Sequence, residues 1–284
     1  MSNASLDLSS KVPKEHVDVI RRVVRTATNL GLTNLFIVGA QARDLILQYA
    51  YNVAVRRATN DIDFGIVVET WEDFAKLRDD LITNEGFQAH PHQQQRLIQS
   101  EGAIIDLVPF GNLEQAKGLI AWPPDFAVEM STIGFREAYA NSLDVRLADE
   151  LVVKVASLVG QALLKIVAWS DRRFERDAQD FGLIMRSYLD AGNRDRLYGD
   201  HGDCSDLLTD EDFDYDKASA RVLGRDIGRI LTEESGSIIE LIVTAEDERE
   251  RLSAALVGHN ANYHGNADMA STMLEALRQG LSER

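Results

Sequence analysis

The amino-acid sequence predicts an α+β fold, in which a mixed sheet flanked by helices is followed by a mainly helical C-terminal region. Two observations carry this prediction. In the first half, short apolar runs with strand character alternate with amphipathic segments, whereas from about residue 160 the recurring pattern is that of a helix. The composition, with 45% hydrophobic and 27% charged residues in a chain of 284, is that of a folded globular protein.

Periodicity and stop signals define the elements of the first half. Apolar side chains recur at helical spacing up to Gly31, which predicts an opening amphipathic helix. In residues 61–68 the alternation is strict, with Ile62 and Phe64 on one face of a strand and Asp61 and Asp63 on the other. The predicted elements are helix 17–30, strand 34–40 with a glycine turn, helix 42–50, strand 61–68, a helix ending at Gly86, and two strands within 95–111 joined across Ser100, Glu101 and Gly102.

The second half begins with strand-like residues 143–157 and then becomes helical. The expected helices are 160–173, 176–190, 217–231, 233–257 and 268–282, and the polar, acidic residues 191–216 predict a surface loop. We divide the chain into an N-terminal extension or tag remnant (1–13), a sheet-containing domain (14–150) and a helical domain (151–284), with a boundary near 145–160.

The charge balance restricts the classes of partner. Forty-six Asp and Glu against 30 Lys and Arg give a net charge of −16, the wrong sign for nonspecific binding to nucleic acid or to an anionic membrane. A nucleic-acid substrate would therefore require a local basic patch. The candidate basic positions are Arg56, Arg57, Lys165, Arg172, Arg173 and Arg176.

The sequence also favours a cytoplasmic location. No apolar run approaches the roughly 20 residues that span a bilayer, and the N-terminus lacks the pattern of a secretory signal. Cys204 is the single cysteine, which excludes an intrachain disulfide framework and a thiolate-rich zinc site. We expect a soluble cytoplasmic protein that does not act in a membrane.

Three aspartates are the strongest chemical signal. Strand geometry places Asp61 and Asp63 on one face, about 7 Å apart along the strand. Asp106 interrupts a second apolar strand, and three converging carboxylates would repel one another strongly without a cation. Carboxylates suit hard cations, so we predict a site for one or two Mg²⁺ ions, with Mn²⁺ as the alternative. The competing interpretation is an acidic turn before a strand.

A glycine turn lies one loop upstream, in "VGAQARDL" (38–45). Gly39 allows the backbone to turn tightly, and the helix that follows presents free N–H groups suited to phosphate. Arg43 offers a bidentate phosphate contact, and Asp44 favours the helix N-terminus electrostatically.

The helix at 160–173 contains "KIVAWSDR". Lys165 and Arg172 are two helical turns apart, so both project from one face. Asp177 and Asp180 follow at i, i+3 and are placed to orient Arg172, or to serve proton transfer or metal support. Alternatively, Lys165 is a snorkelling lysine on a structural helix.

These pieces in this order resemble the DNA polymerase β-like nucleotidyltransferase superfamily. They are most similar to the AbiEii/MenT type of nucleotidyltransferases, some of which are toxins of toxin–antitoxin pairs. The motifs of that family are a Gly-Ser or Gly-Gly turn, DxD, a later acid, a K-h-h-x-h-x-x-R helix (h is apolar) and D-x-x-D. The matching stretches are Gly39–Ala40, Asp61–Asp63, Asp106, Lys165–Arg172 and Asp177–Asp180, within residues 35–190.

The resemblance implies a nucleotidyltransferase-type sheet, a catalytic domain at 14–150 and transfer of a nucleoside monophosphate from an NTP to a hydroxyl, with release of pyrophosphate. It implies that Asp61 and Asp63 bind both metals, that Asp106 binds one metal and helps activate the acceptor, and that Lys165 and Arg172 contact phosphate. The implied catalytic residues are Asp61, Asp63, Asp106, Lys165 and Asp177, and the implied nucleotide-binding residues are Gly39, Ala40, Gln41, Arg43, Lys165 and Arg172. The implied partners are an NTP, a tRNA or other RNA acceptor, and an antitoxin protein.

The sequence departs from the family at the glycine turn, where Ala40 and Gln41 stand in place of a common serine. The hydroxyl contact to the triphosphate is missing, and Gln41 or backbone N–H groups are the candidate substitutes. The stretch also resembles the G-G-x-V-R-D opening of tRNA CCA-adding enzymes, whose nucleotide-selecting motifs are not found downstream. Two alternatives stay open: a catalytically silent nucleotide- or partner-binding protein, and nucleotide transfer to a protein side chain.

One further basic pair has two interpretations. Arg225 and Arg229 lie one helical turn apart and could contact an RNA acceptor. More commonly such arginines pair with neighbouring acids, which are plentiful in this chain.

Overall fold

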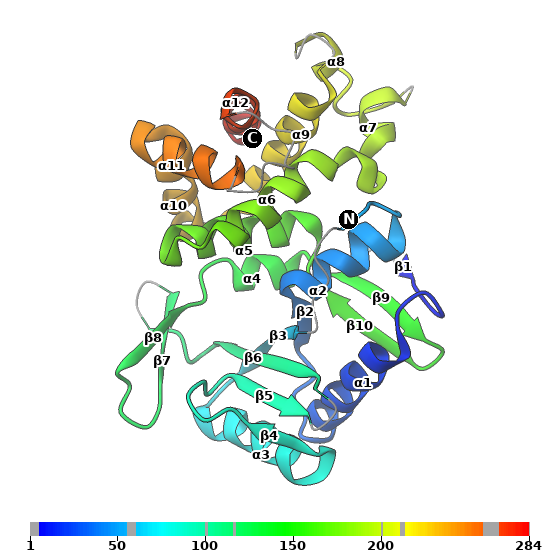
Figure 1. Cartoon of the computed structure of the whole chain (residues 1–284), viewed down its shortest axis with the longest axis vertical. Coiled ribbons are helices and arrows are strands. Elements are labelled where there is room, and N and C mark those ends of the chain that lie inside the picture. The colour runs from blue at the N-terminus through cyan, green and yellow to red at the C-terminus, as the bar shows by residue number, and fades with distance from the viewer. Residues whose placement is uncertain are drawn as a thin grey trace. The chain divides into compact units, whose positions relative to one another are not determined.

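The structure is a computed structural model that describes residues 6–55, 61–99, 102–115, 118–199, 201–210, 214–257 and 267–283. It divides into two compact units, Met1–Ser157 and Leu158–Arg284 (Figure 1). The first unit contains a mixed sheet flanked by helices and the second is helical, as predicted. None of the helices in these described ranges is long and apolar enough to cross a bilayer.

The sheet of the first unit has eight strands in the order β1-β9-β10-β2-β3-β6-β5-β4. Its strands are β1 (Leu6–Asp7), β9 (Leu143–Ala148), β10 (Leu151–Val155), β2 (Leu35–Val38), β3 (Asp61–Val68), β6 (Ile104–Gly111), β5 (Arg96–Gln99) and β4 (Phe87–Ala89). Strands β3 and β6 run parallel, while β2 pairs antiparallel with β3 and β5 pairs antiparallel with β6. The two central acidic strands are therefore neighbours.

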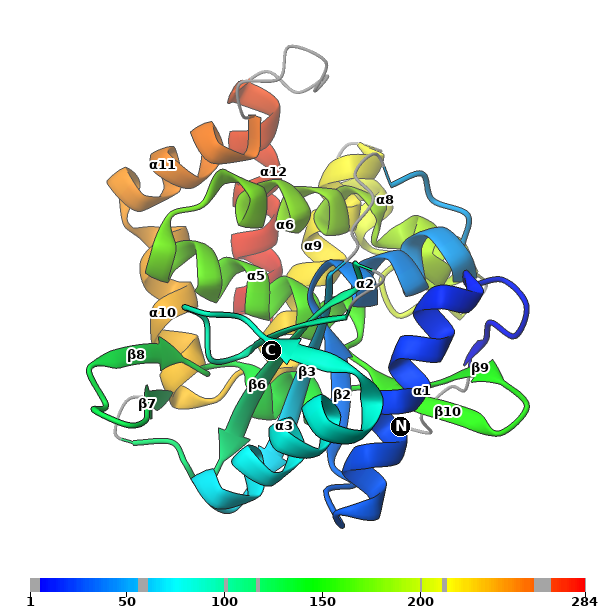
Figure 2. The same cartoon turned by 60° about the horizontal axis from the view of Figure 1, so that its bottom comes forward.

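Two helices cover one face of this sheet. Helices α1 (Lys14–Asn29) and α3 (Trp71–Glu85) lie side by side against it, as Figure 2 shows. The alternating apolar residues of β3, from Ile62 to Val68, are fully buried, which is why the strand follows its period-two pattern. Helix α3 starts at Thr70, whose hydroxyl accepts from the Asp73 N–H, and ends at Gly86 in the left-handed conformation.

The opposite face carries an aromatic cluster at one end. Phe36 and Phe110 pack against Phe135 and Tyr139 of helix α4 (Phe135–Ala140), with ring centroids 5.4–6.3 Å apart. The rings meet edge-on except for Phe110 and Phe135, which are tilted at 50°. Strands β3 and β6 carry Asp61, Asp63 and Asp106 near the other end of this face. A separate hairpin is formed by β7 (Leu119–Trp122) and β8 (Val128–Ser131).

The N-terminal residues differ from the prediction of an extension or tag remnant at 1–13. Leu6 and Asp7 form β1, which pairs in parallel with Val145 and Arg146 of β9. Leu8 is 1% exposed, so its side chain is part of the core. The segment is too short to show a periodicity, which is why this strand was not visible in the sequence.

The second unit consists of helices. They are α5 (Leu158–Arg172), α6 (Glu175–Ser187), α7 (Arg194–Tyr198), α8 (Leu207–Asp210), α9 (Tyr215–Ile230), α10 (Glu233–Thr244), α11 (Glu246–Val257) and α12 (Ala267–Ser282). Between α6 and α7 the segment η3 (Leu189–Asn193) is kinked at Ala191 and Gly192. Helices α9 and α12 approach closely at two glycines, because a Cβ on Gly224 would lie 2.3 Å from the Leu277 carbonyl and one on Gly280 would lie 2.1 Å from the Arg221 carbonyl.

Two predictions for this unit are corrected. The single helix expected at 233–257 is two helices, because Ala245 has extended backbone angles and the acidic Glu246–Glu248 begins a new first turn. The loop expected at 191–216 contains α7 and α8.

In the first unit, helix α2 (Gly39–Asp44) starts directly at Gly39 and continues as the π-helix η1 (Leu45–Ala50).

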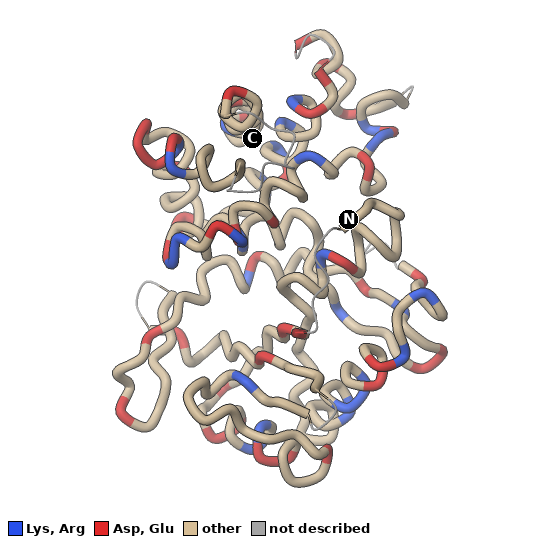
Figure 3. Tube along the Cα trace, viewed as in Figure 1, with Lys and Arg blue, Asp and Glu red and all other residues tan. Residues whose placement is uncertain are grey.

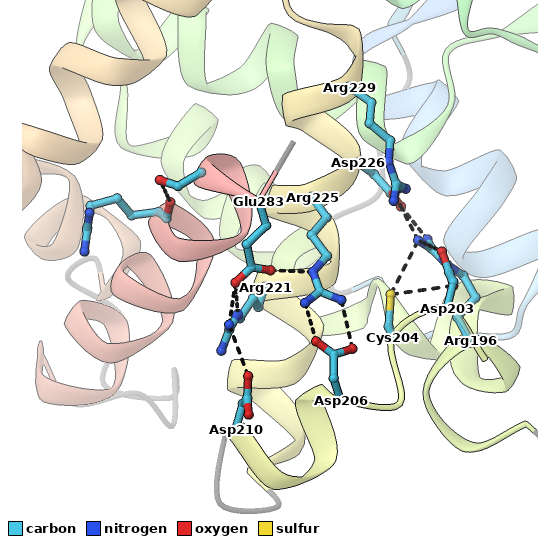
Figure 4. Close-up of polar contacts among 12 residues, drawn as sticks. Arg196, Asp203, Cys204, Asp206, Asp210, Arg221, Arg225, Asp226, Arg229 and Glu283 are labelled. Carbon is cyan, nitrogen blue, oxygen red and sulfur yellow. Dashed lines mark hydrogen bonds and ion pairs between the residues drawn. The ribbon is translucent and has the colours of Figure 1, made fainter. Parts of the chain in front are cut away.

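Ion pairs hold the polar segment around α7 and α8 against α9 and α12 (Figure 4). Arg225 binds both oxygens of Asp206 and also Glu283, and Arg229 binds Asp226. The interpretation that these arginines pair with neighbouring acids is confirmed. The same network includes Arg196, Asp203, Cys204, Asp210 and Arg221.

Candidate active site

The register of two parallel strands brings two of the predicted aspartates together. Asp63 of β3 pairs directly with Asp106 of β6, so their side chains lie on the same face of adjacent strands, which are about 4.8 Å apart. Asp61 precedes Asp63 by two residues and shares that face. The side chain of Asp61 is 38% exposed and that of Asp106 is 14% exposed. The three carboxylates therefore gather at one end of this face of the sheet.

The predicted glycine turn lies against the same end. Val38 at the end of β2 is the register partner of Asp63, and Gly39 follows with φ +68°. A Cβ at this position would lie 1.9 Å from Asp63 Oδ2, so the absence of a side chain at Gly39 makes room for the Asp63 carboxylate. The turn and the DxD motif are one structural unit.

Sequence reasoning missed one residue of this site, Arg96 on β5. Arg96 Nε donates to Asp106 Oδ1 at 2.8 Å and its Nη2 to Asp106 Oδ2 at 2.6 Å, and Nη2 also lies 3.3 Å from Asp61 Oδ2. A signal for it was present. Strands β5 and β6 are close in sequence and pair antiparallel, with Leu97 opposite Ile105, and continuing this register places Arg96 opposite Asp106.

The predicted metal site contains carboxylates, which are suitable ligands for a hard cation, but the guanidinium of Arg96 is bound to it. In the described ranges, no three His, Cys, Asp or Glu side chains are arranged as ligands of one metal ion. Both oxygens of Asp106 accept hydrogen bonds from Arg96. Carboxylates on adjacent strands fit a hard cation, and Arg96 supplies the positive charge that such a cluster needs.

The helix after the glycine turn differs from a simple phosphate site. Ala40 is buried, and Gln41 is 1% exposed with an Nε2 that has no hydrogen-bond partner within the described structure. Such an unsatisfied donor fits the predicted substitution of Gln41 for the missing serine. Arg43 is 1% exposed and donates from Nε and Nη2 to Asp44, so the structure offers no support for its predicted phosphate contact.

The second unit gathers the remaining predicted residues into a buried ion-pair cluster. Lys165 Nζ lies 3.1 Å from Asp177 Oδ1 and 2.6 Å from Asp180 Oδ2. Arg172 binds Asp177 through two hydrogen bonds of 2.7 and 2.9 Å. Burial raises the pKa of Asp177, but hydrogen bonding to Arg172 and the charge of Lys165 outweigh it, so the pKa lies below its ordinary value. Lys165 is thus held by two acids, and the snorkelling interpretation is wrong.

The turn between α5 and α6 presents arginines around an exposed aromatic ring. Phe174 is 48% exposed, and the guanidinium carbons of Arg172 and Arg176 lie 5.4 and 5.0 Å from its ring centroid. Arg173 has φ +56°, stacks 4.5 Å over Trp169 and pairs with Glu248. Elsewhere, basic and acidic positions are interspersed along both units (Figure 3). The other predicted basic positions, Arg56 and Arg57, lie outside the described residues.

A comparison with protein-family models identifies the family of this chain. The family model described as nucleotidyl transferase AbiEii toxin, type IV toxin–antitoxin system, matches residues 46–257. The chain belongs to the AbiEii family. It is therefore a nucleotidyltransferase. The matched range contains the predicted residues from Asp61 to Asp180, while the turn at Gly39 precedes it.

Other comparisons are more distant. Curated proteins show no significant match to this chain. Among the solved structures that match is the solution structure of the antibiotic-resistance factor ANT(2'')-Ia, with 15% sequence identity and a TM-score of 0.39. That match covers 66% of this chain and 95% of the other.

Proposed function

We propose that this AbiEii-family protein transfers a nucleoside monophosphate from an NTP to a hydroxyl of an RNA, tRNA above all, with Mg²⁺ or Mn²⁺ held by Asp61, Asp63 and Asp106. The observation that carries the proposal is the register of Asp63 with Asp106 beside the turn at Gly39. It supports a shared cation site next to a backbone turn able to admit phosphate.

The reaction forms a bond between the acceptor oxygen and the α-phosphorus and breaks the bond from that phosphorus to the β-phosphate, so pyrophosphate leaves. When bound, the metal would lower the pKa of the attacking hydroxyl and neutralise charge on the pyrophosphate. Asp106, released from Arg96, is the candidate to accept the hydroxyl proton. Lys165 and Arg172 are the candidate contacts to phosphate, and Asp177 holds both cations in place.

The turn between α5 and α6 favours a nucleic-acid acceptor despite the net charge of −16. An exposed aromatic ring flanked by guanidinium groups suits a base that stacks and a phosphate that is neutralised. RNA and NTPs are both cytoplasmic substrates, so we propose that the protein acts there. Family membership further supports a toxin role with an antitoxin protein as partner.

The test is incubation with Mg²⁺ and each of four α-labelled NTPs, with total RNA or total protein as acceptor. The control pair is an Asp61→Asn/Asp63→Asn double variant and Asp79→Asn, which removes an exposed carboxylate of α3. We expect label from one NTP in RNA, lost in the double variant and retained in Asp79→Asn. Label in protein would indicate a protein-modifying enzyme, and metal-dependent NTP binding without label in either fraction would indicate a silent binder.

A further inference from the structure

Arg96 is a cation bound at the position where the proposed function requires a metal ion. Its guanidinium makes two hydrogen bonds to Asp106 and approaches Asp61, so it touches two of the three predicted metal ligands. Its side chain lies on β5, the second strand from one edge of the sheet, and is 24% exposed to solvent. A bidentate guanidinium–carboxylate pair uses both oxygens of Asp106 that a metal would coordinate.

We propose that Arg96 is a positioning residue that competes with the metal for Asp106 and Asp61, and that the metal–NTP complex displaces it. The inference rests on the proposed function, because it presupposes a metal at these aspartates. Arg96 would then determine when Asp106 can coordinate the metal.

The chemistry of the guanidinium shows what can release it. A guanidinium stays protonated at physiological pH, so proton loss from Arg96 cannot free the carboxylate. Release then requires a competing cation for the aspartates together with an anion for the guanidinium. A metal-bound triphosphate offers both, whereas a free metal ion offers only the first.

We expect the site to bind free metal and nucleotide-bound metal with different affinities. Free Mn²⁺ must displace Arg96 without offering it a new partner, so its affinity for the wild-type protein is weak. A non-hydrolysable NTP analogue gives Arg96 a phosphate partner and strengthens Mn²⁺ binding. In a variant without Arg96, free Mn²⁺ binds tightly, and the NTP analogue increases the Mn²⁺ affinity less than it does in the wild type.

The experiment measures Mn²⁺ binding by electron paramagnetic resonance, with and without the analogue, in the full chain and in the variants Arg96→Gln, Arg96→Lys and Asp63→Asn. We expect Arg96→Gln to bind free Mn²⁺ at least tenfold more tightly than the wild type, which corresponds to about 1.4 kcal/mol. Arg96→Lys, which keeps the charge but loses the bidentate geometry, should lie between them. Thermal unfolding checks that each variant is folded.

The outcomes separate this inference from the proposed function. Equal Mn²⁺ affinity in wild type and Arg96→Gln, lost in Asp63→Asn, would overturn the competition and leave the metal site standing. Weaker Mn²⁺ binding by folded Arg96→Gln would also overturn it, because Arg96 would then organise the ligands. If no variant binds Mn²⁺ even with the analogue, the metal site fails and the inference fails with it.

Discussion

Replacing Gly39 with alanine tests whether the glycine turn and the DxD motif form one site. The substitution acts in two ways. Alanine at φ +68° costs about 1–2 kcal/mol of stability, because the left-handed conformation brings Cβ close to the following carbonyl. The new Cβ also lies 1.9 Å from Asp63 Oδ2 and must be separated from it by 3.4 Å for ordinary contact, so the two must move apart by 3.4 − 1.9, about 1.5 Å.

A displacement of this size should abolish most of the activity. A misplacement of about 1 Å in a catalytic group costs on the order of 100-fold in rate. We therefore expect Gly39→Ala to lower kcat/KM for label transfer from an α-labelled NTP by at least about 100-fold, equivalent to roughly 2.7 kcal/mol of transition-state stabilisation.

Gly31→Ala is the matched control. Gly31 has φ +77° and nothing lies within 4 Å of the place that a Cβ would take, so alanine there adds the same backbone strain without touching Asp63. Urea unfolding should show similar losses of stability for the two variants, and the transfer assay should show a loss for Gly39→Ala alone. Full activity in folded Gly39→Ala, or an equal loss of activity in Gly31→Ala, would show that the contact between residue 39 and Asp63 does not control activity.

Three further substitutions test other parts of the structure. Asp177→Asn should cost about 3–5 kcal/mol at pH 7, because two cations lose a buried carboxylate. Because the pKa of Asp177 is lowered in the folded protein, its carboxylate stabilises the fold above about pH 4, the pKa in the unfolded chain, and this stabilisation is lost as the pH falls through the folded pKa. In urea unfolding at decreasing pH, the difference in stability between the wild type and Asp177→Asn should therefore become smaller. Phe174→Ala should weaken binding of single-stranded RNA in a filter-binding assay by about 1–3 kcal/mol, whereas alanine at the 62% exposed Val128 should not, and equal effects would contradict base stacking. Leu8→Ala should cost about 2–5 kcal/mol in urea unfolding because Leu8 is buried, and a cost no larger than that of alanine at the 57% exposed Leu241 would show that β1 adds nothing to the fold.

The sequence predicted the features that depend on local periodicity. The alternation in residues 61–68 placed Asp61 and Asp63 on one face, and β3 has that geometry. Helical spacing placed Lys165 and Arg172 on one face of α5, and both bind Asp177. The mixed sheet and the helical second half followed from the same patterns, because each element buries its apolar stripe.

Features that depend on pairing between distant residues were not visible. The register of Asp63 with Asp106 joins strands separated by α3, and no local pattern specifies it. Arg96 was missed because its role depends on the register of the β5–β6 hairpin, which the predicted turn indicated but which was not followed to the residue opposite Asp106. Arg43 was predicted to contact phosphate because a guanidinium binds phosphate through two hydrogen bonds, yet its side chain is buried beside Asp44.

We propose the β3–β6 carboxylates as the centre of nucleotidyl transfer. Comparing NTPs labelled at the α- and γ-phosphates, using the wild type and Asp63→Asn with the RNA acceptor, tests this directly. We expect α-label in the acceptor and γ-label in released pyrophosphate for the wild type, with neither product formed by Asp63→Asn. Undiminished transfer by Asp63→Asn, or γ-label in the acceptor, would contradict it.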